Sequence, residues 1–291
     1  MDVAAKQAVI NVRKTICYPQ EEKKMLIIGE KINSTLKAIR PAIEAYDEAT
    51  IKQVAKDQFE AGAHIIDINA GTFVDDEPER MAWLAKTVQS VVDAPLAVDS
   101  PSAKAMRAGL EANDKKHKPI INSITDESER YKEVAPLIVE FKAAVVGLCM
   151  NDEGMPETAD DRFKIADSLI NKLTKDGVPI EDIYIDPLVR PISTGDHYGH
   201  VAIDTIREVK KKYPGVRIAC GLSNISFQLP ARKLINQAFL VAAVGAGMDG
   251  TIIDPLDKKL MAMLYASIAL FGRDPFCKNY LKKFRAGEIE V

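Results

Sequence analysis

Short apolar, β-branched runs alternate with longer helical patterns along the chain, and this alternation constrains the fold more than any other feature of the sequence. Such alternation is typical of βα units that build a parallel sheet. The runs begin 24 to 40 residues apart, about the length of one strand, one helix and two loops. They begin at Met25, His64, Pro95, Pro119, Ala143, Ile183, Arg217 and Met248. The sequence therefore predicts eight parallel strands.

The segments between these runs have the pattern of helices. We expect helices over residues 49–61, 78–92, 103–113, 127–142, 160–175, 201–212, 231–244 and 258–271. Eight repeats without a break in composition favour one closed (β/α)8 barrel, a TIM barrel, over residues 25–291, because open doubly wound sheets more often have about five or six strands. Two α/β domains are the alternative, but no Gly/Ser/Pro-rich linker divides the chain. Residues 1–24 are expected to form an N-terminal extension.

Composition excludes several classes of protein. A net charge of −3 and a pI near 5.9 give no basic field for nucleic acid. The cysteines form no CxxC pair, which argues against a disulfide framework or an iron–sulfur site; they are Cys17, Cys149, Cys220 and Cys277. No apolar run reaches the length of a membrane span, and the N-terminus does not have the pattern of a signal peptide. We therefore expect a cytoplasmic protein that binds neither membrane nor nucleic acid.

Polar side chains stand where nearly every predicted strand ends. The positions are Glu30, Asp67, Asn69, Asp99, Asn122, Asn151, Asp186, Asn224 and Asp254. In barrels of this kind the carboxyl ends of the strands carry the chemistry. Any one of these residues could equally be a helix cap or a turn residue. The set as a whole predicts a pocket rich in hydrogen-bond donors and acceptors, which suits a polar heterocycle.

A metal site is the competing use of converging carboxylates. Of the four histidines, only His197 and His200 follow a predicted strand end, and no HExxH or HxxEH frame surrounds them. We therefore expect no metal bound by this chain. The glycines of GAGMDG, from Gly245 to Gly250, fit GxGxxG but follow a helix and precede a strand, the reverse of the order in a dinucleotide-binding turn. A helix C-cap and tight packing explain them better.

Strings at successive strand ends resemble the pterin-binding methyltransferases, particularly the methyltetrahydrofolate:corrinoid protein methyltransferases and the folate module of cobalamin-dependent methionine synthase. The resemblance runs from about Met25 to the C-terminus. It rests on IIGEKIN from Ile27, DIN from Asp67, VDS from Val98, INS from Ile121, YIDPL from Tyr184, GLSNISF from Gly221 and GMDGTIIDP from Gly247. Each string is weak alone, but their order and their placement at successive strand ends make the set specific.

The resemblance implies that the chain moves a methyl group between N5 of tetrahydrofolate and the cobalt of a corrinoid, in either direction. It implies that the pterin ring is bound by Asn69, Asp99, Asn122, Asp186 and Asn224. It also implies that Asn224 lies beside the nitrogen that carries the methyl group and acts in catalysis with Asp186. A carboxylate suits the N–H edge of a pterin, and an amide both donates and accepts. Phe227 replaces a Gln of the corrinoid/iron–sulfur branch, which leaves the corrinoid partner unidentified.

The corrinoid is expected on a separate protein. A chain of 291 residues has no room for homocysteine and cobalamin modules, and no DxHxxG cobalamin motif occurs. The resemblance also implies a homodimer. A dihydropteroate synthase-like enzyme is the sharpest alternative, but the chain has DPLVRP, SNIS and IIDP where that family has its Gly/Phe-rich loop, Ser-Arg-Lys and Arg-Val-His motifs. A non-catalytic folate-binding protein is the other alternative.

Overall fold

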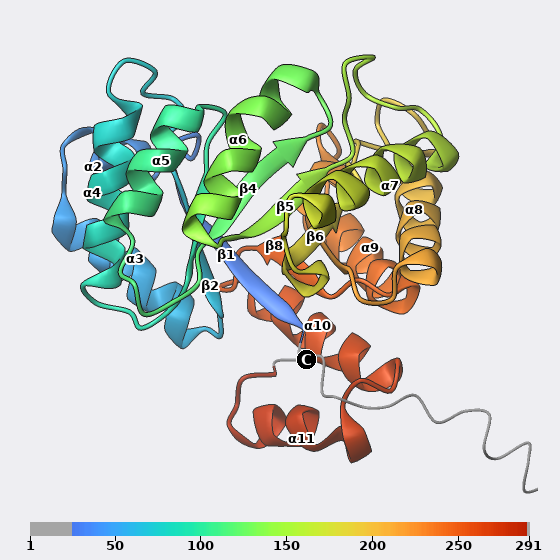
Figure 1. The fold of residues 1–291 in the computed structure, drawn as a ribbon. Helices are drawn as coiled ribbons and strands as arrows, with labels where there is room; N and C mark the ends of the chain where they lie inside the picture. Colours follow the sequence, from blue (N-terminus) through green and yellow to red (C-terminus); the bar gives the residue numbers. More distant parts are fainter. Residues whose placement is uncertain (1–24, 290–291) are drawn as a thin grey trace, which may run out of the picture.

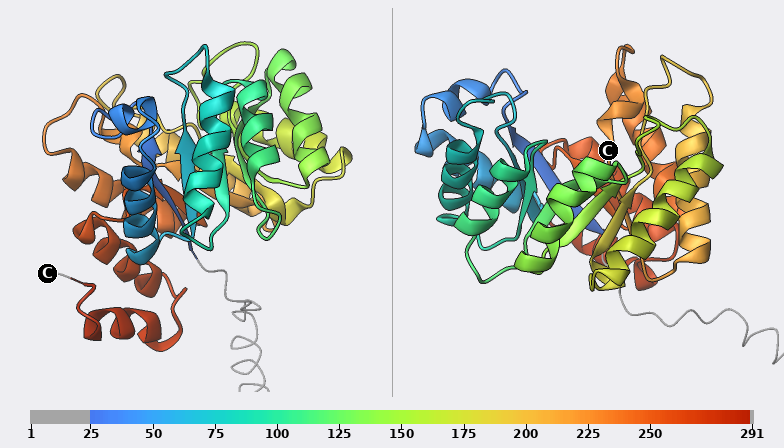
Figure 2. Two further views of the ribbon diagram at one scale, coloured as in Figure 1. Left: turned by 90° about the vertical axis from the view of Figure 1, so that its left-hand side faces the viewer. Right: turned by 45° about the horizontal axis from the view of Figure 1, so that its top comes forward.

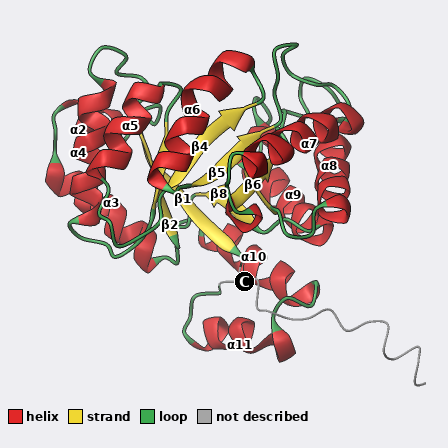
Figure 3. Cartoon of the chain, in the orientation of Figure 1, coloured by secondary structure: helices red, strands yellow, loops and turns green. Residues whose placement is uncertain are grey.

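The computed structural model describes residues 25–289, and the predicted extension over 1–24 lies outside this range. Eight parallel strands close into a barrel in chain order, so each strand pairs with its sequence neighbours and β8 pairs with β1 (Figure 3). The strands are β1 (Leu26–Asn33), β2 (Ile65–Asn69), β3 (Leu96–Asp99), β4 (Ile120–Thr125), β5 (Ala144–Leu148), β6 (Ile183–Asp186), β7 (Arg217–Gly221) and β8 (Gly250–Ile253). The predicted (β/α)8 barrel is confirmed.

Helices cover the outside of the barrel (Figure 1). The eight predicted helices are present within a few residues of their expected ends. They are α3 (Glu48–Glu60), α4 (Glu77–Gln89), α5 (Ala103–Ala112), α6 (Ser128–Phe141), α7 (Ala159–Lys175), α8 (Tyr198–Lys212), α9 (Arg232–Ala246) and α10 (Lys258–Leu270). The sequence did not predict α2 (Arg40–Glu44), α11 (Lys278–Arg285) or the 3-10 turns η1 (Ile180–Asp182), η2 (Ser223–Ser226) and η3 (Pro275–Cys277). No helix within residues 25–289 is long and apolar enough to span a membrane.

Strand alternation divides the apolar side chains into two cores. Successive side chains of a strand point to opposite faces, so residues two apart share a face. The barrel interior holds one small cluster with at least one residue from each strand: Leu26, Ile28, Ile65, Ala97, Ile120, Ala144, Val146, Tyr184, Ala219 and Ile252. The larger cluster lies between the sheet and the helices. Counting in steps of two from the interior cluster therefore identifies the side chains that face the mouth of the barrel.

The pairing of β1 with β2 shifts by one residue in the middle of β1. Gly29 pairs with Ile66, but Ile32 pairs with Ile68, so three steps on β1 match two on β2. Ile28 belongs to the interior cluster, whereas Ile32 packs in the outer core, which strict alternation would not allow. Such irregularities re-aim side chains near barrel rims. The strand also runs on to Asn33, three residues beyond the predicted end at Glu30.

Helix α11 lies at the other end of the barrel. The views of Figures 1 and 2 place it beside α10 and near the start of β1, away from the carboxyl ends of the strands. Gly247, one of the glycines of GAGMDG, ends α9 with a left-handed φ of 115°. Its backbone N–H bonds the Val244 carbonyl, as expected for a helix C-cap.

Candidate functional site

Three neighbouring strands bring Asn69, Asp99 and Asn122 side by side at the mouth. Asn69 pairs with Asp99, and Asp99 pairs with Asn122, in the registers of β2, β3 and β4. The Asn69 amide nitrogen donates to Asp99 Oδ2 at 2.9 Å, while its oxygen accepts from the Ser34 hydroxyl at 3.1 Å and from the Gly71 N–H at 2.9 Å. These bonds fix the orientation of the Asn69 amide, and Asn69 in turn orients the Asp99 carboxylate.

A second amide–carboxylate pair lies deeper in the barrel. Asp67 is two residues before Asn69 on β2, and only 2% of its surface is exposed. Its Oδ2 accepts a hydrogen bond from Asn122 Nδ2 at 3.1 Å. Burial raises the pKa of Asp67 well above its usual value, and the charge of Asp99 raises it further. Asp67 therefore positions the Asn122 amide.

Asp186 ends β6 and faces the same interior, two residues after Tyr184 of the interior cluster. Its Oδ1 accepts the backbone N–H of Leu188 at 2.8 Å. Burial raises the pKa of Asp186 to about 7, although backbone N–H groups and the nearby charge of Arg162 oppose this rise. Arg162 of α7 is fully buried and donates to the carbonyls of Pro187 and Leu188 at 2.9 and 2.8 Å. Arg162 therefore holds the turn that carries Asp186.

Asn224 lies in η2, immediately after β7, with an exposed side chain. Within residues 25–289 its amide makes no hydrogen bond, and neither η2 nor α9 has a side-chain cap from it. The turn itself is held by Arg232, which donates to the Ser223 carbonyl at 2.7 Å and to the Ser226 hydroxyl at 3.1 Å. The backbone of this turn is thus fixed, while the Asn224 amide is free to meet a ligand.

Charged side chains gather on the β7, β8 and β1 side of the mouth. Lys31 Nζ lies 3.0 Å from Asp254 Oδ2, and Lys31 and Asp254 are each about a third exposed. Glu30, the neighbour of Lys31, is half-buried. Burial raises the pKa of Glu30 to about 7, Asp254 adds to the rise, and Lys31 and Arg232 oppose it. The mouth therefore has an ionic side and, across β2 to β4, an amide-rich side.

Burial also raises the pKa of Asp99, to about 6. The hydrogen bond from Asn69 and the charge of Arg130 lower it, and the charge of Glu77 raises it. Arg130 of α6 is itself held by three backbone carbonyls, those of Pro101, Ser100 and Ser123, at 2.5, 2.8 and 2.6 Å. The arginine therefore acts on Asp99 through its charge from behind the strand ends, without pairing with it.

His197 lies in the loop after β6, with its ring tilted against that of Tyr198 at a centroid distance of 4.4 Å and its Nδ1 3.6 Å from Asp196 Oδ1. Within the described part of the chain, no group of three or more His, Cys, Asp or Glu side chains is arranged to hold a metal ion.

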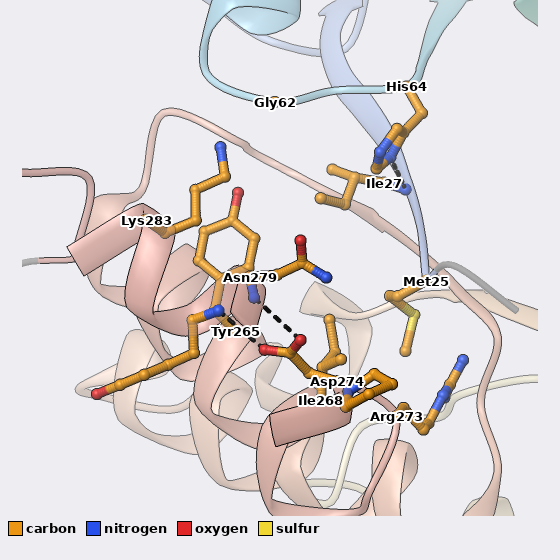
Figure 4. Close-up of a pocket in the computed structure, with 12 residues that line it drawn as sticks. Met25, Ile27, Gly62, His64, Tyr265, Ile268, Arg273, Asp274, Asn279 and Lys283 are labelled. Atoms are coloured by element: carbon orange, nitrogen blue, oxygen red, sulfur yellow. Dashed lines mark hydrogen bonds between the residues drawn. The ribbon is translucent and has the colours of Figure 1, made fainter. Parts of the chain in front are cut away.

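A cavity of about 270 Å³ lies at the opposite end of the strands, between the starts of β1 and β2 and helices α10 and α11 (Figure 4). Its lining includes His64, Tyr265, Asn279 and Lys283. Asp274 also lines it, but its carboxylate is occupied by the backbone N–H groups of Asn279 and Tyr280. In barrels of this kind that face serves stability, and the chemistry belongs to the carboxyl ends of the strands. We therefore assign the candidate site to the mouth.

The structure brings most of the predicted site residues together. Asn69, Asp99, Asn122 and Asp186 face one interior, and Asn224 lies on the rim of the same mouth. The sequence places Glu30 and Asp67 in the strand-end set but assigns them no individual role, and it does not single out Arg162 or Arg232. Counting in steps of two from Ile65 would have placed Asp67 in the interior, whereas a buried arginine in a helix leaves no signal of this kind.

The closed barrel presents carboxyl and amide groups together at its strand ends, a set of donors and acceptors that suits a polar ring system. Comparison with known families specifies the class. The model of the pterin binding enzyme family matches residues 30–254, which include every predicted site residue. The chain belongs to this family.

Two relatives by sequence are informative. The chain is 36% identical over 270 residues to the methylcorrinoid:tetrahydrofolate methyltransferase of Eubacterium limosum, covering 91% of this chain and 98% of the relative. It is 35% identical over 264 residues to the methionine synthase of Mycobacterium tuberculosis, covering 86% of this chain but 22% of that protein. The chain therefore spans about a fifth of the methionine synthase.

Solved structures share the fold at lower identity. The 7,8-dihydropteroate synthase of Vibrio fischeri matches with a TM-score of 0.68 at 16% identity, over 88% of this chain and 96% of that one. The dihydropteroate synthase of Yersinia pestis matches with a TM-score of 0.62, also at 16% identity, over 86% and 93% of the two chains. At this identity the likeness supports the barrel fold alone.

Proposed function

We propose that this protein is a methyltransferase that moves a methyl group between N5 of tetrahydrofolate and the cobalt of a corrinoid carried by a separate protein. The observation that carries the proposal is the convergence of Asp99, Asn122 and Asp186 on one barrel interior. A pterin presents a guanidine-like edge of N–H donors next to ring acceptors. Two carboxylates and an amide can satisfy that mixed edge with charge-assisted hydrogen bonds.

Asn69 is proposed to orient Asp99. Hydrogen bonds from Ser34 and Gly71 fix the Asn69 amide, and the amide in turn donates to Asp99, so we assign it the role of holding the Asp99 carboxylate toward the ring. Asp67 does the same for Asn122. Preorganised acceptors of this kind bind a ligand without the cost of ordering their own side chains.

Asn224 is proposed to act at the methyl-bearing nitrogen. Its amide is unpaired within the described chain and stands on the rim, beside the interior that would hold the ring. An amide can donate to a nitrogen lone pair or accept from an N–H, so one side chain serves either direction of transfer. A hydrogen bond that strengthens as charge changes at N5 stabilises the transition state more than the bound substrate.

We propose transfer from the methylated corrinoid to tetrahydrofolate as the net direction. The support is the Eubacterium limosum relative, whose name states that direction and which this chain covers almost end to end. The corrinoid must approach along the barrel axis, because attack on a methyl carbon is in line. A homodimer with both mouths open is expected from the family resemblance. Sedimentation that finds only monomer would contradict the dimer.

The direct test is to mix the protein with tetrahydrofolate and free methylcobalamin as the methyl donor. We expect 5-methyltetrahydrofolate by mass spectrometry and the spectrum of reduced cobalamin under exclusion of oxygen. Folate binding without transfer would identify a non-catalytic folate-binding protein. Formation of dihydropteroate from the pterin pyrophosphate and p-aminobenzoate would identify a dihydropteroate synthase instead. Either of these outcomes would overturn the proposal.

A further inference from the structure

Methyl transfer to N5 releases a proton, and the proposed site needs a group to receive it. The carbon–cobalt bond breaks and leaves its electron pair on cobalt, the N5–carbon bond forms, and N5 gives up its hydrogen as a proton. The reverse reaction takes one proton back. Asn224 cannot hold that proton, because an amide does not ionise near neutral pH. Asp186 is assigned to the N–H edge of the pterin, which keeps it ionised. The following inference rests on the proposed function and asks where this proton goes.

Glu30 is a carboxyl group at the mouth, in the shifted segment of β1 between Gly29 and Ile32. The charges of Asp67, Asp254 and Arg232, from β2, β8 and α9, all act on it, which places its carboxyl at the mouth. Within residues 25–289 its carboxyl forms no hydrogen bond, and its side chain is half-buried. A half-buried carboxyl without a hydrogen-bond partner in the chain is available to a ligand or to ordered water.

The register shift in β1 puts two charged residues, Glu30 and Lys31, in a stretch of the strand where strict alternation would have room for one. Glu30 and Lys31 lie inside the shifted segment between Gly29 and Ile32. Lys31 reaches across to Asp254, the residue after β8, so the charge of Asp254 is compensated. Glu30 has no such direct partner among the described residues 25–289. In this arrangement Asp254 is paired with Lys31, whereas Glu30 is not paired with a cation of the described chain.

Charges on each neighbouring element act on Glu30 in opposite senses. Asp254 after β8 and Asp67 on β2 repel its charged form, while Lys31 on β1 and Arg232 on α9 attract it. Burial has the largest effect. The balance raises the pKa of Glu30 to about 7. A carboxyl group with this pKa both accepts and returns protons near neutral pH, which is what a reversible proton carrier needs.

Arg232 links Glu30 to the turn that holds Asn224. The guanidinium bonds the Ser223 carbonyl and the Ser226 hydroxyl, on either side of Asn224 in η2, and its charge also acts on Glu30. Pairing places the elements side by side, because Gly221 of β7 pairs with Ile252 and Ile253 of β8 pairs with Gly29. Two strand spacings span about 10 Å, a distance that a short chain of ordered water can bridge.

We propose that Glu30 holds the proton that leaves N5 on methylation and returns it in the reverse reaction, through ordered water beside Asn224. When the methyl group moves to tetrahydrofolate, the Glu30 carboxylate receives the proton and then passes it to solvent. When the methyl group moves to cobalt, the neutral Glu30 carboxyl supplies the proton as the N5–carbon bond breaks. The charges of Asp254, Lys31 and Arg232 tune the pKa of Glu30.

The test compares Glu30→Gln with Glu153→Gln, which makes the same chemical change on an exposed residue of the β5–α7 loop at the same end of the barrel. Transfer from free methylcobalamin to tetrahydrofolate is measured in single turnover from pH 5.5 to 9, with tetrahydrofolate saturating at every pH so that the titration of Asp186 on binding does not contribute. In the unchanged protein and in Glu153→Gln, the rate should rise with pH through an inflection near 7. In Glu30→Gln the inflection should disappear and the rate should fall about 100-fold. The affinity of this variant for tetrahydrofolate, measured by titration calorimetry, should stay within about threefold of that of the unchanged protein. An inflection that persists in Glu30→Gln overturns the proposal.

Two further measurements keep the result unambiguous. Infrared difference spectra of the ligand-free protein, with Glu30→Gln as the reference, report directly whether the Glu30 carboxyl loses its proton near pH 7. A titration below pH 5 overturns the proposal even if methyl transfer occurs. Glu30→Asp, which keeps an acid on a shorter side chain, should retain the inflection at a reduced rate, and this result is expected even if Glu30→Gln folds poorly. A protein that binds tetrahydrofolate but transfers no methyl group refutes the proposed function itself.

Discussion

The Asp186 carboxylate accepts the backbone N–H of Leu188 at 2.8 Å, and Leu188 is held in turn by its carbonyl bond to Arg162. The carboxylate is therefore oriented by its own turn before any ligand arrives. Leu188 has a positive φ of 57°, which an L-residue rarely adopts, so the turn keeps this shape because Arg162 and Asp186 bond it on both sides. The affinity for tetrahydrofolate and its dependence on pH follow from this arrangement.

Asp186→Ala should weaken tetrahydrofolate binding about 10-fold to 100-fold, more than any other single change in the mouth. The reason is the loss of a charge-assisted contact to several pterin N–H groups, each contact being worth about 1.5 to 3 kcal/mol. Titration calorimetry on chelator-treated protein measures this. Asp196→Ala, which removes a fully exposed carboxylate in the loop after β6, is the matched control and should bind normally. An unchanged affinity for Asp186→Ala, or binding that requires zinc, would contradict the assignment.

Asn224→Ala should lower kcat and kcat/KM together by about 100-fold to 1000-fold, because the amide acts mainly on the transition state. Folate affinity should change much less. Stability should stay within about 0.5 kcal/mol, since the side chain is exposed and makes no hydrogen bond within residues 25–289. Methyl transfer and thermal unfolding are measured side by side. A normal rate in a destabilised protein would show that Asn224 is only a structural residue.

Tetrahydrofolate affinity should rise about tenfold between pH 6 and pH 8. Burial raises the pKa of Asp186 to about 7, and the pterin N–H groups need its ionised form, so binding below pH 7 must first remove a proton. Titration calorimetry in phosphate and in Tris should show that this proton is released. Asp186→Asn should bind weakly at all pH values without this dependence. A flat affinity in the unchanged protein would mean that Asp186 is already ionised before binding.

The ligand-free protein should unfold at a higher temperature at pH 5.5 than at pH 8. The pKa values of Glu30, Asp99 and Asp186 are raised to about 7, 6 and 7, so these groups bind protons more tightly in the folded chain than in the unfolded chain. Their contribution is complete below about pH 4, where both states are protonated, and is lost as pH rises through 6 to 7. Each group contributes a slope of about 1.4 kcal/mol per pH unit within its own window.

Calorimetry of Asp186→Asn tests this sign, because the variant should depend less on pH between 5.5 and 8. Asp196→Asn, a fully exposed carboxylate, should behave as the unchanged protein does. Carboxylates whose pKa is lowered, such as Asp47 and Asp161, titrate below this range and should not mask the effect. A stability that rises from pH 5.5 to 8 would show that the mouth carboxylates are ionised in the folded chain.

The strands and most helices could be predicted from the sequence because their signals are local. A buried parallel strand is a short apolar run, and the polar residue that ends it marks the mouth. The helices α2 and α11 were missed because each is short, and α11 has no fully buried residue to give an apolar period. Neither the Lys31–Asp254 ion pair nor the contact of Arg162 with the turn after β6 could be predicted. Each joins residues that are distant in the chain, so each depends on the closed barrel.

The site was predictable to the extent that it follows from alternation. Asn69, Asp99, Asn122 and Asp186 stand at strand ends and face inward because each lies an even number of positions after an interior residue of its own strand, namely Ile65, Ala97, Ile120 and Tyr184. Their orientation and protonation were not predictable, because these depend on cross-strand partners such as Ser34 and on burial. Asn224 was identified through family resemblance, and the structure adds that its amide is unpaired within the described chain.

The register shift in β1 implies that insertions and deletions matter more at this position than substitutions. Removing one residue between Gly29 and Ile32 would restore strict alternation with Ile32 still in the outer core, and would leave one charged residue in the segment that now holds both Glu30 and Lys31. No single substitution makes that change. Across related barrels, the length of this segment should therefore vary together with the presence of charge at the β1 edge, even where the flanking residues differ.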